Sequence, residues 1–418
     1  MSGKSAKDLA DWKFSPTFAV INKQTLSMNL YRLTILAFTA FVSVAIYGQL
    51  FTPLGLGIEK CERKGDFSQP KMHVDGDTLY VCTSQGLYSK DLSSEESVWQ
   101  LVGFKDIPLQ DYVRRGDDIL ALRFNVNGDF LLLSHDGGKT YEDITPDVFR
   151  EHTGWKEVLT NLVQHPTDPN TLLVSSVPMG LFQSLDFGLT WDKLTDIMPG
   201  FIGYHPLNPN VIYNSGEDDV MSPRVNISYD GGHTWNFLRL PFPGDNCVHQ
   251  IAFHPTNPVK WIVGGEGVVY TSMDNGFTWD IQNFWEDARR VAYWFFTVFD
   301  NENSDIVYMA GVADKLKVMC STDGGNSWSI PITEPIKKPE IEYVNDLKQY
   351  DNKLLIYTET DVYEISKAEL LAQATSVRNI SDTTIERTSF FSLSGHRLTT
   401  PPTQKGIYIR DGKKVLIK

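Results

Sequence analysis

Short apolar runs recur along the chain between about residue 70 and residue 380, and polar turns separate them. Runs such as "GLFQS" (residues 180–184) and "VVYTS" (residues 268–272) have the length of β-strands. The intervening segments are rich in Gly, Pro, Asn and Asp, which favour tight turns. The pattern predicts an all-β protein of many short strands, with one short helical stretch around Glu369 to Ala374.

One eight-residue segment, here called the box, occurs five times. The serines that begin the boxes are separated by 50, 44, 44 and 49 residues. The copies are "SHDGGKTY" (134–141), "SLDFGLTW" (184–191), "SYDGGHTW" (228–235), "SMDNGFTW" (272–279) and "STDGGNSW" (321–328). A repeat of this length made of short strands is typical of four-stranded blades in a β-propeller.

Each box position has a mechanical role that favours scaffolding over catalysis. The aspartate can accept backbone N–H bonds from the turn that it begins, and the glycine two residues later supplies a positive φ. The final aromatic residue starts the next strand and buries a large ring. We therefore expect a structural role for all five box aspartates: Asp136, Asp186, Asp230, Asp274 and Asp323.

Two further blades lack a regular box. Residues 71–102 contain strands and a stretched box from Ser89 to Trp99, and residues 344–366 contain three strands. A fourth strand is expected near Ser376 to Ile380. Seven blades are predicted, with six or eight as alternatives.

The boxes resemble the Asp-box, or BNR, repeats of sialidases, xyloglucanase-type glycoside hydrolases, sortilin-type receptors and photosystem II assembly propellers. The resemblance covers residues 70–380 and implies a single β-propeller, in enzymes and binding proteins alike. Two departures weigh against an enzyme. The chain lacks the Arg-Ile-Pro motif of sialidases, and it has one propeller where xyloglucanase-type enzymes hold substrate between two.

The two ends of the chain predict export. The stretch from Met28 to Gln49 has one arginine, an apolar run and a small residue before Gln49, which is the layout of a signal peptide. A membrane anchor is the alternative, and residues 1–27 are interpreted as lying upstream of the true start at Met28 or as disordered. Residues 388–418, with "SLSGHRL", "KGIYI" and "KKVLIK", resemble the sorting tails of the type IX secretion system of Bacteroidetes, and form a short β-rich unit.

Charge and cysteine content exclude several classes of protein. The 38 basic and 52 acidic side chains give a net charge of −14, and no basic stripe is present, so nucleic acid is not an expected partner. The four cysteines show no metal-like spacing, and neither a metal nor a cofactor is expected. Cys61 and Cys82 are either buried thiols or one disulfide. His165, His205 and His254 occupy equivalent turns in successive blades, so they are too far apart for a metal site.

Functional residues are expected in the loops that lead into each first strand and in the turns between second and third strands, because these meet on one face of a propeller. The possible carboxylates of a glycoside hydrolase are Glu217, Asp219, Asp245 and Glu266. The possible ligand-binding residues are Trp155, Trp285, Arg289, Arg290 and Arg224. By contrast, Trp294 to Phe296 are expected in the blade core.

The sequence thus predicts an exported propeller, periplasmic, surface-located or extracellular, that binds a glycan or a protein as a monomer, with possible association with the cell envelope. A glycoside hydrolase of the sialidase or xyloglucanase type is the alternative, and an assembly or scaffold factor is a third.

Overall fold

The computed structural model describes residues 50–57, 69–124, 130–150, 158–177, 179–197, 200–217, 223–240, 248–287, 289–337, 343–374, 390–391, 406–410 and 413–417. The chain divides into two compact units, Met1–Phe51 and Thr52–Lys418. The predicted signal peptide lies outside the described residues.

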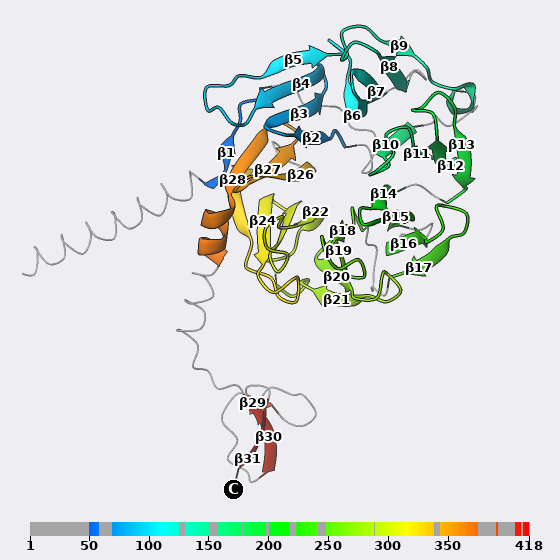
Figure 1. Cartoon of the computed structure of the whole chain (residues 1–418). Helices are drawn as coiled ribbons and strands as arrows, with labels where there is room; N and C mark the ends of the chain where they lie inside the picture. The colour runs from blue at the N-terminus through cyan, green and yellow to red at the C-terminus, as the bar shows by residue number, and fades with distance from the viewer. Residues whose placement is uncertain are drawn as a thin grey trace, which may run out of the picture. The chain divides into compact units, whose positions relative to one another are not determined.

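Seven four-stranded antiparallel sheets form the blades of a ring (Figure 1). The fold class and the number of blades are therefore as predicted. Blade 1 consists of β2 (Met72–Asp75), β3 (Thr78–Thr83), β4 (Gly86–Asp91) and β5 (Gln100–Gly103), and blade 2 of β6 (Leu109–Arg115), β7 (Asp118–Arg123), β8 (Leu131–Ser134) and β9 (Glu142–Asp143). Blade 3 consists of β10 (Val158–Gln164), β11 (Leu172–Val177), β12 (Gly180–Ser184) and β13 (Asp192–Thr195), and blade 4 of β14 (Phe201–His205), β15 (Asn208–Glu217), β16 (Pro223–Ser228) and β17 (Asn236–Arg239). Blade 5 consists of β18 (Ala252–Phe253), β19 (Trp261–Gly265), β20 (Val268–Ser272) and β21 (Asp280–Asn283), and blade 6 of β22 (Tyr293–Phe299), β23 (Val307–Val312), β24 (Lys315–Ser321) and β25 (Ile332–Lys337). Blade 7 consists of β26 (Val344–Tyr350), β27 (Lys353–Thr358), β28 (Val362–Ser366) and β1 (Thr52–Pro53).

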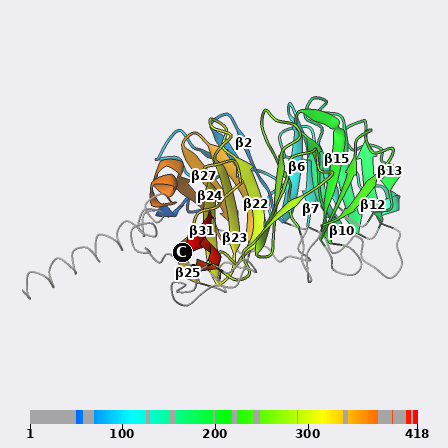
Figure 2. The same ribbon diagram turned by 90° about the horizontal axis from the view of Figure 1, so that it is seen from below.

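The first strand of each blade lies nearest the ring centre, and the strands run between two faces (Figure 2). Because neighbouring strands are antiparallel, the turns between strands 1 and 2 share one face with the boxes, which join strands 3 and 4. We call this the box face. The connections into each first strand and the turns between strands 2 and 3 lie on the opposite face, called here the front face.

The last blade is completed by the beginning of the chain. Thr52 and Pro53 of β1 pair with Glu364 and Tyr363 of β28. The prediction of a fourth strand near residues 376–380 is therefore wrong for this blade, because β1 already occupies the outer edge of β28, and residues 376–380 lie outside the described ones. The helical stretch at residues 367–374 is present, as predicted.

Apolar side chains fill the space between neighbouring blades. Val225 and Ile227 of blade 4 pack with Trp261 and Val263 of blade 5, all at most 1% exposed. The side chains of Trp294, Phe295 and Phe296 are buried at 0–3% exposure, as predicted. Burial on both faces of each sheet explains why the strands read as short continuous apolar runs.

All five boxes have the same hydrogen bonds. In the box of blade 4, Gly232 N donates to Ser228 Oγ (2.7 Å), Ser228 Oγ donates to Asp230 Oδ1 (2.8 Å), and Thr234 N and Oγ1 donate to the two carboxylate oxygens (2.8 and 2.6 Å). The equivalent bonds recur around Asp136, Asp186, Asp274 and Asp323. The box is thus a self-contained turn whose polar groups are used within the turn.

The turns between strands 1 and 2 use a second repeated device. The Nδ1 atoms of His165, His205 and His254 each accept hydrogen bonds from the backbone N–H groups two and three residues later. In blade 6 the carboxylate of Asp300 accepts the same two bonds, from Glu302 N and Asn303 N at 2.9 Å. Histidine and aspartate therefore serve as interchangeable turn caps here, which accounts for the repeated histidines without a metal.

The C-terminal segment forms a separate three-stranded antiparallel sheet of β29 (Phe390–Phe391), β30 (Gly406–Arg410) and β31 (Lys413–Ile417). No helix among the described residues is long and apolar enough to span a membrane. The side chains of Cys82 and Cys320 are buried, at 0% and 1% exposure. Cys61, the proposed partner of Cys82, lies outside the described residues.

Candidate functional site

Two of the residues singled out on the front face, Glu266 and Trp285, lie close together. Trp285 follows β21 in the connection to β22, and its side chain is 44% exposed. Its ring lies against Gly267, where an added Cβ would be 3.2 Å from the ring, and Gly267 has φ +62°. A glycine is thus required both by the backbone conformation and by the ring above it.

Tyr293 contacts the same turn through its backbone and is not among the residues that the sequence predicts for a site. It begins β22, is 46% exposed, and forms an isolated β-bridge with Glu266. Gly267 N also donates to Ala292 O at 2.9 Å, which ties the turn to the start of β22. Trp285 and Tyr293 therefore flank the Glu266–Gly267 turn and present two aromatic side chains to solvent. We call these three residues, Glu266, Trp285 and Tyr293, the aromatic platform.

A row of rings leads inward from the platform. Tyr293 stacks on Phe295 with ring centroids 6.4 Å apart, Phe295 lies 4.6 Å from the His249 ring, and His249 lies 5.3 Å from Phe201. Burial, and then the charge of Lys71, lower the pKa of His249 to about 3. His249 is thus a neutral member of an aromatic row.

The arginines at the front face are held by a neighbouring acid. Arg289 Nε and Nη2 lie 2.8 and 3.0 Å from the two carboxylate oxygens of Asp287, and Arg290 Nη1 lies 3.0 Å from Oδ2. The pKa of Asp287 is lowered, chiefly by the hydrogen bond from Arg289. Arg290 also donates to the backbone carbonyls of Trp328 and Ser329. A ligand carboxylate at this position would compete with Asp287.

The remaining predicted residues are dispersed. Arg224 is 1% exposed within β16, so it does not lie at a surface. Glu217 ends β15. Trp155, Asp219 and Asp245 lie outside the described residues. The structure thus brings together Glu266 and Trp285, and it buries Arg224.

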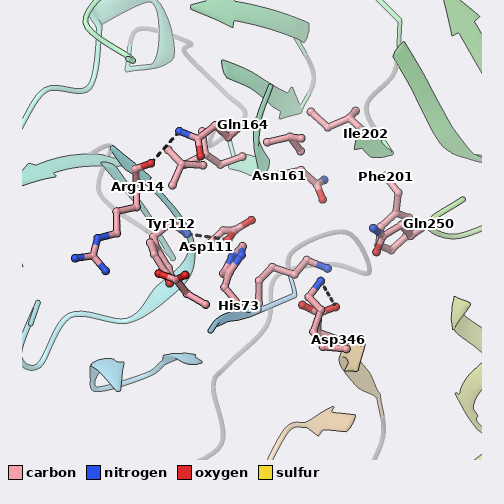
Figure 3. A pocket seen from close by; sticks show the side chains of 16 residues that line it. His73, Asp111, Tyr112, Arg114, Asn161, Gln164, Phe201, Ile202, Gln250 and Asp346 are labelled. Carbon is pink, nitrogen blue, oxygen red and sulfur yellow. Dashed lines mark hydrogen bonds and ion pairs between the residues drawn. The ribbon is translucent and has the colours of Figure 1, made fainter. Parts of the chain in front are cut away.

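A cavity of about 400 Å³ lies at the centre of the ring (Figure 3). Its walls come from the first strands of blades 1, 2, 3, 4 and 7, and from Gln250 just before β18. The charged side chains that line it are Lys71, Asp75, Asp111, Arg114, Asp346 and Lys348. Three are basic and three are acidic, so these side chains carry no net formal charge.

The cavity extends toward the box face. In β10 the lining residues are Asn161 to Gln164, the second half of the strand, and in β6 they are Asp111 to Arg114, around its centre. In β14 they are Phe201 and Ile202 at the front-face end of the strand, close to Lys71. First strands run from the front face to the box face. The polar lining therefore extends toward the face opposite to the one on which the sequence predicts the site.

Both buried carboxylates of the cavity wall are engaged within the protein. Asp111 Oδ1 lies 2.7 Å from His73 Nε2 and accepts a bond from Tyr112 N at 2.8 Å. Asp346 accepts bonds from Met72 N (3.1 Å) and Leu347 N (2.9 Å), and Lys348 Nζ lies 3.2 Å from it.

β-Bulges determine which side chains reach the cavity. The strand register shifts immediately before Asp111, Asn161 and Asp346 in β6, β10 and β26. A bulge re-aims the side chains that follow it, and Figure 3 shows all three residues around the cavity. The sequence contains a signal for this cavity wall. In segments such as "KMHVDGD" and "VNDLKQY", polar residues alternate with apolar ones, whereas a fully buried first strand would be apolar throughout.

The ammonium group of Lys71 lies across the inner end of the cavity. Its Nζ atom is 4.6 Å from the Phe296 ring centroid, 5.7 Å from that of Phe201, and 3.4 Å from Asn345 O. These contacts join blades 1, 4, 6 and 7 at the ring axis. Across the described ranges, no cluster of three or more His, Cys, Asp or Glu side chains is arranged to hold a metal ion.

Comparison with solved structures gives two kinds of similar protein. A GH74 xyloglucanase from Xanthomonas campestris superposes with a TM-score of 0.54 at 14% identity, over 75% of this chain and 53% of that one. YCF48 from Cyanidioschyzon merolae superposes with a TM-score of 0.53 at 10% identity, over 76% of this chain and 98% of that one. YCF48 bound to D1 peptide gives 0.51 at 13% identity, over 75% and 98%. The chain shares the β-propeller fold of these proteins.

Sequence comparison gives a shorter match. A stretch of 144 residues, 33% of this chain, is 29% identical to the VPS10 domain-containing receptor SorCS3 of Mus musculus and 28% identical to that of Homo sapiens. The chain spans about a tenth of the length of these curated relatives. No protein-family model matches the chain.

Proposed function

We propose that this chain is an exported binding module that recognises a glycan or a protein segment through the aromatic platform on its front face. The observation that carries the proposal is the Trp285 ring, which remains 44% exposed although it is fixed against Gly267. A rigid exposed tryptophan loses little conformational entropy when it stacks on a ligand, which is why such residues dominate binding energies. Tyr293 beside it enlarges the apolar contact area.

Binding is favoured over hydrolysis by the state of the central carboxylates. A glycosidase needs two carboxyl groups that reach the glycosidic bond. Asp346 is 1% exposed and Asp111 is 7% exposed, and both are bonded to backbone N–H groups and to a neighbouring His or Lys side chain. These bonds would have to be broken before either carboxylate could take part in catalysis.

The similar proteins support both ligand classes. One is a xyloglucanase, and YCF48 is recorded with a bound peptide. Export rests on the signal-peptide layout of residues 28–49 and on the resemblance of residues 388–418 to sorting tails, and an Asp-box origin of the boxes rests on their sequence and their shared turn geometry.

The test is a binding screen of the purified chain against glycan and peptide panels, with released sugar recorded in the same samples. Trp285→Ala should lower affinity roughly five- to thirtyfold, the effect of losing about 1–2 kcal/mol of contact energy. Phe277→Ala is the matched control, because Phe277 is 57% exposed but belongs to a box on the opposite face. Equal affinities for the wild type and Trp285→Ala would refute the proposal.

A glycoside hydrolase is the second candidate, and the position of Glu266 favours it. Glu266 belongs to the turn that Trp285 and Tyr293 contact, and its carboxylate would supply one of the two that hydrolysis needs. If sugar is released and Glu266→Gln abolishes the release while binding persists, the hydrolase replaces the binding module as the function.

A further inference from the structure

We propose that the central cavity is a second, separate site, which binds a neutral sugar of one or two pyranose units entering from the box face. The site does not involve the aromatic platform. Its ligand class follows from the shape, charge and hydrogen-bonding groups of the cavity wall.

The cavity has the dimensions of a small-ligand site that is closed at one end. Its volume of about 400 Å³ lies within the usual range for such sites. The Lys71 ammonium, held between Phe296, Phe201 and Asn345 O, crosses the channel at the inner end. A ligand therefore enters from the box face and stops at Lys71, so a continuous polymer does not thread through the ring here.

The charges of the wall favour a ligand without net charge. Asp111 is paired with His73 at 2.7 Å, and Asp346 with Lys348 at 3.2 Å. An anionic ligand beside Asp111 or Asp346 would have to compete with these carboxylates for their basic partners, and a cationic ligand there would have to compete with the basic partners for the carboxylates. Each exchange costs desolvation without adding a new ion pair.

The wall offers both donors and acceptors to hydroxyl groups. The side chains of His73 in blade 1 and Lys348 in blade 7 are 39% and 34% exposed. His73 offers its ring nitrogens, and Lys348 offers its ammonium hydrogens. Asn161 and Gln164 use their side-chain amide nitrogens in hydrogen bonds to backbone carbonyls. Their side-chain amide oxygens therefore remain as acceptors for a ligand. Several fixed donors and acceptors at different heights match the alternating hydroxyl groups of a pyranose.

The wall also has an apolar side. Leu162, Val163 and Ile202 line the cavity on blades 3 and 4. A pyranose ring has a C–H face and a hydroxyl rim, so it can pack on this side while its hydroxyl groups reach the polar side.

Blocking the mouth provides the sharpest test. Asp75 lines the cavity at the exposed end of β2, and its carboxylate makes no hydrogen bond with the described residues. Asp75→Trp should therefore fill the mouth without breaking a structural bond, and Asp75→Asn should remove the charge without adding bulk. His73→Ala removes one wall contact, and the thermal unfolding of each variant reports whether it is folded.

Maltose, cellobiose and lactose are the probes, with binding measured on the full chain by saturation-transfer NMR and calorimetry. We expect at least one to bind, with affinity reduced tenfold or more by Asp75→Trp, reduced by His73→Ala, and changed less than twofold by Asp75→Asn. Phe277→Ala, in a box outside both sites, should leave this binding unchanged. A sugar whose binding is lost with Trp285→Ala and kept with Asp75→Trp belongs to the platform instead, which separates this site from the proposed function. The inference is overturned if none of the three sugars binds, if Asp75→Trp binds them normally, or if glucosamine, an acidic sugar or a short peptide binds in the cavity more tightly than they do.

Discussion

Replacing Ser228 with alanine tests whether the box is scaffolding. The Ser228 side chain is fully buried, and its oxygen is the acceptor for the backbone N–H of the buried Gly232 at 2.7 Å. The same hydroxyl donates to Asp230 at 2.8 Å. Alanine removes both bonds and leaves the Gly232 N–H buried without an acceptor.

The expected loss follows from the unpaired donor. A buried N–H group left without an acceptor costs about 1–3 kcal/mol, and alanine leaves no space for water to replace the hydroxyl. The free energy of unfolding of Ser228→Ala should therefore fall by on the order of 1–3 kcal/mol. In urea, the midpoint should fall while the slope remains that of the wild type, because the folded architecture is unchanged.

The control is Ser304→Ala, because Ser304 is partly buried and its hydroxyl makes no hydrogen bond with the described residues. Its free energy of unfolding should stay within about 0.5 kcal/mol of that of the wild type. Ligand binding per folded molecule should be the same for all three proteins. If Ser228→Ala were as stable as the wild type, or if it lost binding without losing stability, the box would not be the structural staple described above.

Two further predictions concern acid stability and ring closure. The pKa of Asp136 and of Asp230 is lowered from 3.8 to about 2 by hydrogen bonds from the threonine four residues later, so these carboxylates bind fewer protons in the folded chain than in the unfolded one. Their stabilisation should be complete above about pH 4 and lost as the pH falls toward 2; urea midpoints should show this fall in the wild type and a smaller one in Asp230→Asn. Leu56 is 7% exposed in the cluster that joins blades 1 and 7, beside the strand that closes the ring. Leu56→Ala should lower the free energy of unfolding by about 2–5 kcal/mol. By contrast, a chain that ends at residue 374 should have the same free energy of unfolding as the full-length chain if β1 alone closes the ring.

The repeated elements were accessible from the sequence because their physics is local. A box holds its hydrogen bonds within a few consecutive residues, so "SYDGGHTW" specifies the same turn wherever it occurs. The turn caps are local in the same way, which is why an aspartate at position 300 can replace the histidine of the other blades. Trp285, which the acidic residues Glu286 and Asp287 follow, is predictable as a possible exposed ring for the same reason.

The features that only the tertiary structure decided depend on contacts between distant parts of the chain. Ring closure joins Thr52 to Glu364, and no local pattern distinguishes a two-residue strand at the beginning of the chain from one after the last blade. The charged wall of the central cavity likewise combines His73 with Asp111 and Met72 N with Asp346, from different blades. The sequence determined the fold because each blade repeats the same short-range interactions. The site depends instead on ring closure and on the β-bulges, which together decide which side chains point toward the common axis.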